Sequence, residues 1–111
     1  MQREGKKYLF DINTCIENIE GFIGDTKIFE TFNQNLMLQQ AVERNIEIIG
    51  EAVSKLLKID AEIKITDARR MVDTRNKIIH GYDSIQPEQI WNIIVNHLPS
   101  LKVEVQMLLE N

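Results

Sequence analysis

The sequence predicts an all-α protein: a single domain over residues 1–111 that forms an up-and-down bundle of four to five helices. Apolar residues recur at steps of three or four through most of the chain. No segment shows the alternating pattern of a strand over a useful length. The 111 residues, 43% of them apolar, suffice for one hydrophobic core, and no low-complexity stretch marks a linker.

Two helices are predicted in the N-terminal half of the chain. The first ends near Gly21 to Gly24, and its apolar stripe consists of Tyr8, Ile12, Ile16, Ile19 and Ile23. The second is the longest, and its apolar positions are Leu38, Ala41, Val42, Ile46, Ile49, Ala52, Val53, Leu56 and Leu57. Gly50 lies inside this helix at a cost of about 1 kcal/mol relative to alanine. We therefore expect another backbone segment to pass close to it.

Two further helices are predicted after a loop around residues 59–65. Thr66 is expected to cap the start of the third helix, and Gly81 to end it in a left-handed turn. Pro87 favours the start of the fourth helix. Pro99 is expected to kink that helix, or to divide it in two near His97. The apolar stripe of the fourth helix is Ile90, Ile94, Leu98, Leu101, Val105 and Leu108.

Composition limits the functions that the chain can have. The formal net charge is -4, yet residues 64–80 hold five basic and two acidic side chains. Such a protein would not coat nucleic acid nonspecifically, but it could admit a polyanion at this one place. A single cysteine, Cys15, excludes an intramolecular disulfide, and no Cys/His pairs have the spacing of a zinc site. Without a signal peptide or a membrane span, we expect a soluble cytoplasmic protein.

Arg75 is the unusual residue of the third helix. On a helical wheel it falls in the middle of an apolar arc formed by Ala68, Met71, Val72, Ile78 and Ile79. Because burying a lone cation is costly, Arg75 must meet a carboxylate, reach water in a cleft or bind an anion. The ordinary explanation is a buried ion pair with Glu51 or Glu47. Asn76 and His80, four residues apart, share a neighbouring face and can place an amide and an imidazole beside the guanidinium.

Structural roles are expected for the remaining candidates. Cys15 is interpreted as a small buried side chain, and His97 as a residue that satisfies a local carbonyl. The aromatic residues occupy positions that suit packing in the core or at a dimer interface better than base stacking. These residues are Trp91, Phe10, Phe22, Phe29 and Phe32. Taken singly, His80 could stabilise a helix C-terminus, and Tyr82 could be a half-buried aromatic.

The string RNKIIHGY, residues 75–82, resembles the R-x4-H-x-Y signature of HepT toxins. These toxins are the branch of the HEPN superfamily that is paired with minimal nucleotidyltransferase antitoxins. Residues 41–56 and 90–101 resemble the second and fourth helices of the family, so the similarity covers most of the chain. The resemblance implies a HEPN-like homodimer that acts as a metal-independent endoribonuclease, without a cofactor, in a type VII toxin-antitoxin system.

The resemblance also implies roles for four residues. His80 would act as general acid and base on the RNA 2′-hydroxyl or leaving oxygen, and Arg75 would stabilise charge on the reacting phosphate. Asn76 would orient or bind the phosphate. Tyr82 would accept AMP from a partner nucleotidyltransferase (MntA-like), which would silence the toxin. Arg75 and His80 stand about 140° apart on one helix, so two copies facing each other across a shared cleft would bring these groups together.

Two other interpretations remain open from the residues alone. The first is a noncatalytic helical dimer whose Arg75 cleft binds a nucleotidyltransferase partner or a nucleotide. The second is a plain dimeric bundle in which Arg75 forms a structural ion pair. In that case Arg75→Met should be neutral or stabilising, because apolar side chains often replace buried ion pairs without loss.

Overall fold

The computed structural model describes residues 2–81 and 85–110, and over these ranges it contains six α-helices and no strand. The all-α prediction is confirmed. The expected number of four to five helices was too low, because the five-residue α2 is too short to show a helical period. The helices are α1 (Arg3–Ile23), α2 (Phe29–Asn33), α3 (Leu36–Ile59), α4 (Ala68–His80), α5 (Pro87–Asn96) and α6 (Leu98–Glu110).

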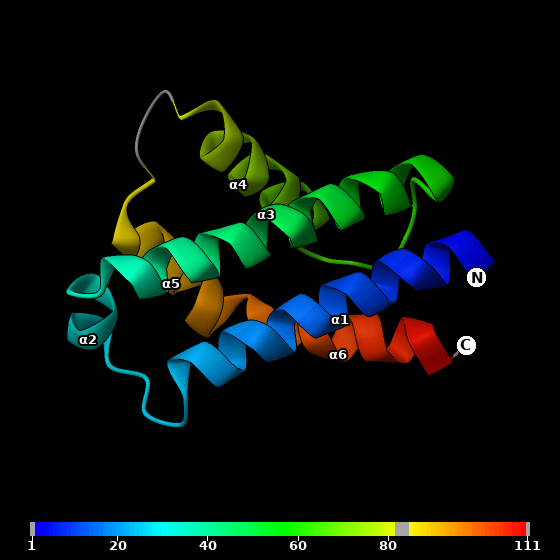
Figure 1. Ribbon diagram of the computed structural model, residues 1–111. Coiled ribbons are helices and arrows are strands. Elements are labelled where there is room, and N and C mark those ends of the chain that lie inside the picture. The colour runs from blue at the N-terminus through cyan, green and yellow to red at the C-terminus, as the bar shows by residue number, and fades with distance from the viewer. Residues whose placement is uncertain (1, 82–84, 111) are drawn as a thin grey trace.

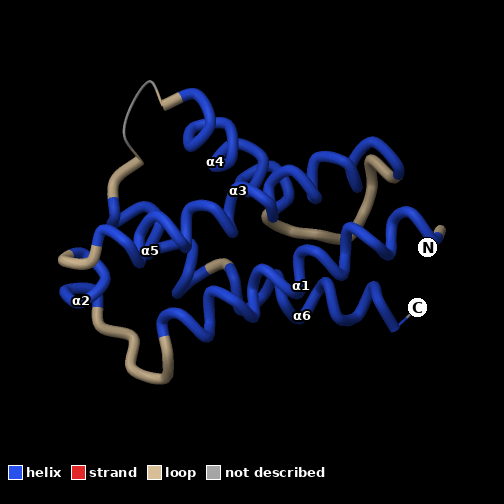
Figure 2. Tube along the Cα trace, in the orientation of Figure 1, coloured by secondary structure: helices blue, strands red, loops and turns tan. Residues whose placement is uncertain are grey.

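The long helix α3 is the centre of the bundle (Figure 1). Helix α4 packs against one side of α3 and α1 against another, and α6 runs beside α1. Helix α5 starts near the N-terminal end of α3 and leads back to α6, and short loops join the elements (Figure 2). The N- and C-terminal ends therefore lie at the same end of the molecule.

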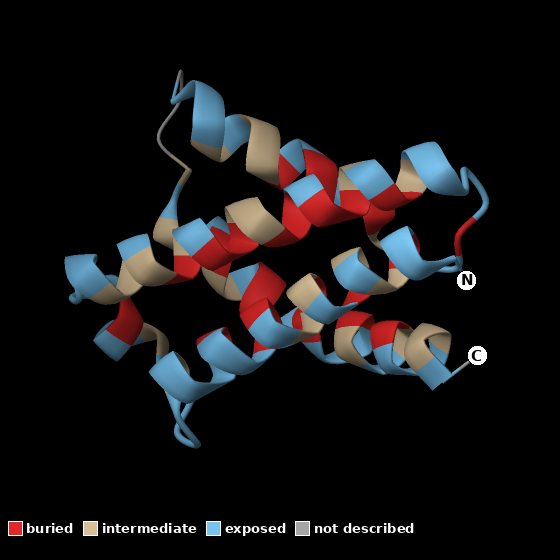
Figure 3. Ribbon diagram, turned by 45° about the vertical axis from the view of Figure 1, so that its right-hand side comes forward, coloured by how far each residue is buried: buried red, intermediate tan, exposed pale blue. Residues whose placement is uncertain are grey.

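The core follows the predicted apolar stripes. Buried residues line the facing sides of α1, α3 and the start of α4, whereas the C-terminal end of α4 is exposed (Figure 3). Leu9, Ile12, Ile46, Val53 and Val105 are completely inaccessible to solvent. At about 25 cal/mol for each Å² of apolar surface removed from water, such burial is the main force that holds the helices together.

Two glycines end helices as expected. Gly81 adopts φ 61° after α4, and its N–H donates to the Lys77 carbonyl oxygen at 3.2 Å. Gly24 adopts φ 77° after α1, and its N–H donates to the Glu20 carbonyl oxygen at 2.9 Å. A left-handed conformation of this kind costs glycine little, because it has no Cβ.

Thr66 does not cap α4, so that prediction was wrong. Asp67 occupies the N-cap position. The Thr66 hydroxyl instead donates to Glu104 Oε2 at 2.7 Å, and its backbone N–H donates to the same carboxylate at 3.1 and 3.2 Å. A charged acceptor forms stronger hydrogen bonds than a neutral one, and this contact ties the loop before α4 to α6.

The predicted break near Pro99 is confirmed. Helix α5 ends at Asn96, and α6 begins at Leu98, so Pro99 lies in the first turn of α6, where its missing N–H is harmless. The expectation for His97 was wrong. Its Nδ1 lies 2.9 Å from Asp67 Oδ2, thirty residues away in sequence, rather than against a local carbonyl. This pair joins the α5–α6 junction to the start of α4.

The aromatic residues divide into two groups. Phe32 of α2 is buried, and its ring centroid lies 5.4 Å from that of Trp91, with Phe29 on the same indole at 5.9 Å. Phe10 and Phe22 are 60% and 47% exposed, so these two do not pack in the core of this chain. Their alternative place, at a dimer interface, stays a prediction.

Candidate active site

The close approach predicted at Gly50 is confirmed, and α4 is the helix that passes there. A Cβ built on Gly50 would overlap Arg75 Cβ and lie only 2.6 Å from the Met71 carbonyl oxygen. The glycine thus lets the backbones of α3 and α4 meet without an intervening side chain. This contact fixes where the base of the Arg75 side chain sits on the surface of α3.

The Arg75 side chain packs its stem against α3 and carries its guanidinium to the surface. The side chain is 30% exposed, and Nη1 donates to Asn76 Oδ1 at 3.3 Å. A long side chain of this kind can cover apolar surface while its charge stays near water. The positive charge of Arg75 is therefore not fully buried, although the residue falls in the apolar arc. Its guanidinium turns toward the side of α4 that carries Asn76.

The carboxylate beside Arg75 belongs to Glu51, which is one of the two partners expected from the sequence. Its Oε2 lies 3.9 Å from Arg75 Nη2, and the Glu51 side chain is 53% exposed. Glu47 instead pairs with Arg44 at 3.1 Å. The expectation of a buried ion pair was therefore right about Glu51 and wrong about burial. A half-exposed pair at this distance contributes less than about 1 kcal/mol, so Glu51 does not lock the guanidinium in place.

One nitrogen of Arg75 is unusual. Arg75 Nε is buried and has no hydrogen-bond partner among the described residues. An unsatisfied buried donor costs about 1–3 kcal/mol. The close contact of α4 with α3 at Gly50 therefore holds Arg75 in place, and its polar contacts are incomplete. A purely structural arginine would be expected to have its buried donors paired.

His80 is the last residue of α4 and is exposed. It follows Asn76 by one helical turn, so these two side chains emerge on the same side of α4, where the Arg75 guanidinium also turns. Ile79 was expected in the apolar arc, but it is 42% exposed. The reason is that α4 meets α3 around Met71 and Arg75 and then rises away from it (Figure 1). Tyr82 lies outside the described residues.

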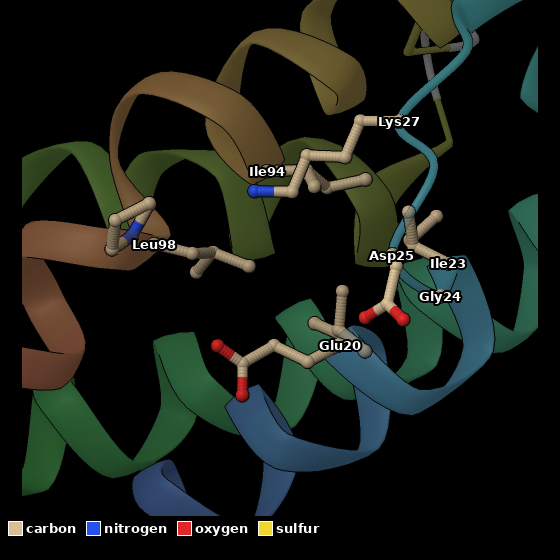
Figure 4. A pocket seen from close by; sticks show the side chains of 9 residues that line it. Glu20, Ile23, Gly24, Asp25, Lys27, Ile94 and Leu98 are labelled. Atoms are coloured by element: carbon tan, nitrogen blue, oxygen red, sulfur yellow. The ribbon is translucent and has the colours of Figure 1, made fainter.

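A separate pocket of about 350 Å³ lies where the end of α1 meets the α5–α6 junction (Figure 4). Its floor is apolar, with Ile94 and Leu98, and its rim carries charges of both signs. Lys27 reaches across from the loop, and Glu20 and Asp25 lie on the opposite side. Glu20 also forms an ion pair with Lys102 at 2.9 Å, which raises the pKa of that lysine. The mixed charge does not favour a polyanion.

Other features found in the described residues are few. No three His, Cys, Asp or Glu side chains gather in an arrangement that could hold a metal ion there. Burial raises the pKa of the Cys15 thiol, so this cysteine suits the structural role predicted for it. Over the same residues, none of the helices combines the length and apolarity needed to cross a membrane.

Comparison with known proteins supports the resemblance seen in the motif. A family described as ribonuclease HepT-like matches residues 12–108. A Thermococcus cleftensis protein named "Probable ribonuclease HepT" is 36% identical over 97% of this chain and 98% of its own length. A Methanocaldococcus jannaschii protein named "Putative RNase MJ1380" is 34% identical over 96% of this chain and 98% of its own. No solved structure matches the chain significantly. The chain belongs to the HepT-like ribonuclease family of the HEPN superfamily.

Proposed function

We propose that this protein is a metal-independent endoribonuclease and the toxin of a type VII HEPN/MNT toxin-antitoxin system in the cytoplasm. The observation that carries the proposal is the Arg75 guanidinium. It reaches the surface of α4 on the side of Asn76, is only loosely held by Glu51, and lies on the side where exposed His80 ends the helix. The names of the relatives agree with a ribonuclease.

The residues suit cleavage by the RNA's own 2′-hydroxyl. Neutral His80 would accept the 2′-hydroxyl proton while that oxygen forms a bond to phosphorus. The bond from phosphorus to the 5′-oxygen would break, and a protonated imidazole would give that oxygen its proton. Arg75 would offer a fork of N–H donors to the phosphate oxygens as charge builds on them, with Asn76 holding the guanidinium in place.

A homodimer would supply both imidazoles. In this proposal the two α4 ends face each other across one cleft, so that one His80 takes a proton while its copy donates one. Residues 64–80 carry a formal charge of about +3, so pairing would raise the charge at the cleft to about +6 and attract RNA there. The acidic remainder of the chain would limit binding elsewhere.

Silencing by AMP at Tyr82 is part of the proposal. A minimal nucleotidyltransferase partner would transfer AMP from ATP to the hydroxyl of Tyr82, which follows Gly81 in the sequence, and release pyrophosphate. The added phosphate and nucleoside would occupy a cationic cleft and compete with RNA. Coexpression with the nucleotidyltransferase should therefore add AMP-sized increments to the intact mass, and Tyr82→Phe should remove them.

His80→Ala tests the catalytic assignment directly. We expect cleavage of a labelled RNA to fall at least a hundredfold, because general acid–base catalysis contributes about 10²–10⁴ in rate. The unfolding temperature and oligomeric state should be unchanged, since His80 is exposed. His97→Gln is the matched control: it removes the other histidine, which contacts Asp67, and should leave cleavage intact. Full cleavage by His80→Ala would disprove the assignment.

A further inference from the structure

A second polar groove lies between α4 and α5. Its volume is about 250 Å³, and Arg70, Thr74 and Lys77 line it from α4. These residues follow one another at steps of four and three, so they share one face of the helix. Asn76, which marks the side of the Arg75 guanidinium, is two residues from Thr74 and thus about 200° around the helix. The groove therefore faces away from the Arg75–Asn76 side of α4, and His80, three residues after Lys77, lies between the two.

The α5 side of the groove offers hydrogen-bond donors. Gln89 and Asn92 line it, and each has its amide oxygen already engaged. Gln89 Oε1 accepts from the Gln86 backbone N–H at 2.9 Å, and Asn92 Oδ1 accepts from Asn96 Nδ2 at 2.6 Å. The NH₂ groups of Gln89 and Asn92 therefore remain available to a ligand. Because only an oxygen can accept from the Gln86 N–H, the orientation of the Gln89 amide is determined.

The α4 side supplies positive charge. Lys77 is exposed and forms no ion pair within residues 2–81 and 85–110. Arg70 forms an ion pair with Asp67, in which Arg70 Nε and Asp67 Oδ1 are 3.6 Å apart, too far for a hydrogen bond, and the Arg70 side chain is 50% exposed, so its other nitrogens can still reach a ligand. Thr74 is buried and donates its hydroxyl to the Arg70 carbonyl oxygen at 2.8 Å, so this hydroxyl has no second hydrogen to offer a ligand.

The charge of its lining distinguishes the groove from two other hollows formed by the described residues. None of its lining residues is a carboxylate, whereas Glu20 and Asp25 line the pocket of Figure 4, and Glu43 lines the hollow on the other side of Lys77. Two cations and two amide donors with no carboxylate among them match a ligand that only accepts hydrogen bonds. The unesterified oxygens of a phosphodiester are such a ligand.

We propose that this groove binds a backbone phosphate of the RNA strand, away from the phosphate that is cleaved. The inference rests on the proposed ribonuclease function and adds a second contact to it. A strand held here and at Arg75 would pass over the exposed C-terminal end of α4, where His80 lies. Holding the strand at two points on either side of the general base would orient the reacting 2′-hydroxyl.

Binding of a 2′-O-methyl oligoribonucleotide tests the groove without any cleavage, because the nucleophile is blocked. Lys77→Gln should weaken its binding about tenfold, the value of one charge-assisted hydrogen bond, as measured by fluorescence anisotropy. The slope of log K against log salt should become shallower by about 0.7. Asn92→Ala, which removes a neutral donor, should weaken binding and leave the slope unchanged. Lys58→Gln is the matched control, since it removes one exposed positive charge at the C-terminal end of α3.

The outcomes separate this inference from the proposed function. If Lys77→Gln and Lys58→Gln bound the oligonucleotide with the same affinity and the same salt dependence, the phosphate contact in the groove would be refuted. The His80 cleavage test would not be affected by that result. If the wild-type protein cut no RNA but Lys77→Gln still weakened oligonucleotide binding specifically, the phosphate contact would stand and the nuclease would not. AMP and inorganic phosphate carry the same chemistry. Binding of either as tight as that of the oligonucleotide, and lost in Lys77→Gln, would assign the groove to a free phosphate compound and overturn the RNA assignment.

Discussion

Replacing Gly50 with alanine is expected to separate α4 from α3. The new methyl group would overlap Arg75 Cβ and lie 2.6 Å from the Met71 carbonyl oxygen, whereas ordinary contacts begin at 3.4 Å. The two backbones would have to move apart by at least about 0.8 Å, because neither the Met71 carbonyl oxygen nor Arg75 Cβ can rotate away as the tip of a side chain can. The strain therefore falls on the packing of the whole helix pair.

The magnitude follows from two opposing effects. Overpacking of a tight contact costs about 1–3 kcal/mol, or more when the backbone must shift. Alanine favours a helix interior over glycine by about 1 kcal/mol. Because the backbone must shift here, the overpacking cost falls in the upper part of its range, about 2–3 kcal/mol, and the net loss is about 1–2 kcal/mol. Such a loss should lower the unfolding temperature of a domain of this size by about 5–10 °C. Because Arg75 moves with α4, cleavage should fall as well, even at temperatures where the variant is folded.

Thermal unfolding followed by far-ultraviolet circular dichroism measures this effect. The matched control is Gly21→Ala in α1, where a Cβ would meet no atom within 4 Å. That variant gains helix propensity without overpacking and should be equally stable or up to about 1 kcal/mol more stable. If Gly50→Ala unfolded at or above the temperature of the wild-type protein, the close approach of α3 and α4 would be refuted.

Two further predictions concern charged residues. Glu51→Gln should change the free energy of unfolding in urea by less than about 1 kcal/mol, because its ion pair with Arg75 is half exposed. Arg75→Met should be neutral or stabilising, because methionine also removes the buried Nε that has no partner among the described residues, yet only this variant should abolish RNA cleavage. A loss near 3 kcal/mol in either variant would indicate a buried pair instead. Burial raises the pKa of Glu43, because the folded protein favours the protonated carboxyl over the charged carboxylate. This preference contributes stability below the unfolded pKa, and the contribution is lost as the pH rises through the folded pKa. Glu43→Gln should therefore be more stable than the wild-type protein at pH 7, with the difference in unfolding temperature vanishing near pH 4; a difference that is constant with pH would contradict this.

The elements that could be predicted were those with a local cause. The 3.6-residue period places the core on α1, α3 and α5–α6, and Gly81 and Pro99 end or begin helices through their own backbone restrictions. The unfavourable glycine within α3 indicated a helix crossing before the identity of α4 was known. Helix α2 could not be predicted, because it forms around the contact of Phe32 with Trp91, which is distant in sequence.

By itself, the sequence determined the fold class, the succession of long helices and the family, because each depends on residue periodicity or on a short motif. Tertiary structure alone decided the environment of the charges. The Thr66 hydroxyl bonds to Glu104 and His97 pairs with Asp67, because partners more than twenty residues apart come within reach only after the helices have packed. The same packing leaves Arg75 at a half-exposed edge rather than in a sealed ion pair, since α4 meets α3 at Gly50 and rises from it toward His80.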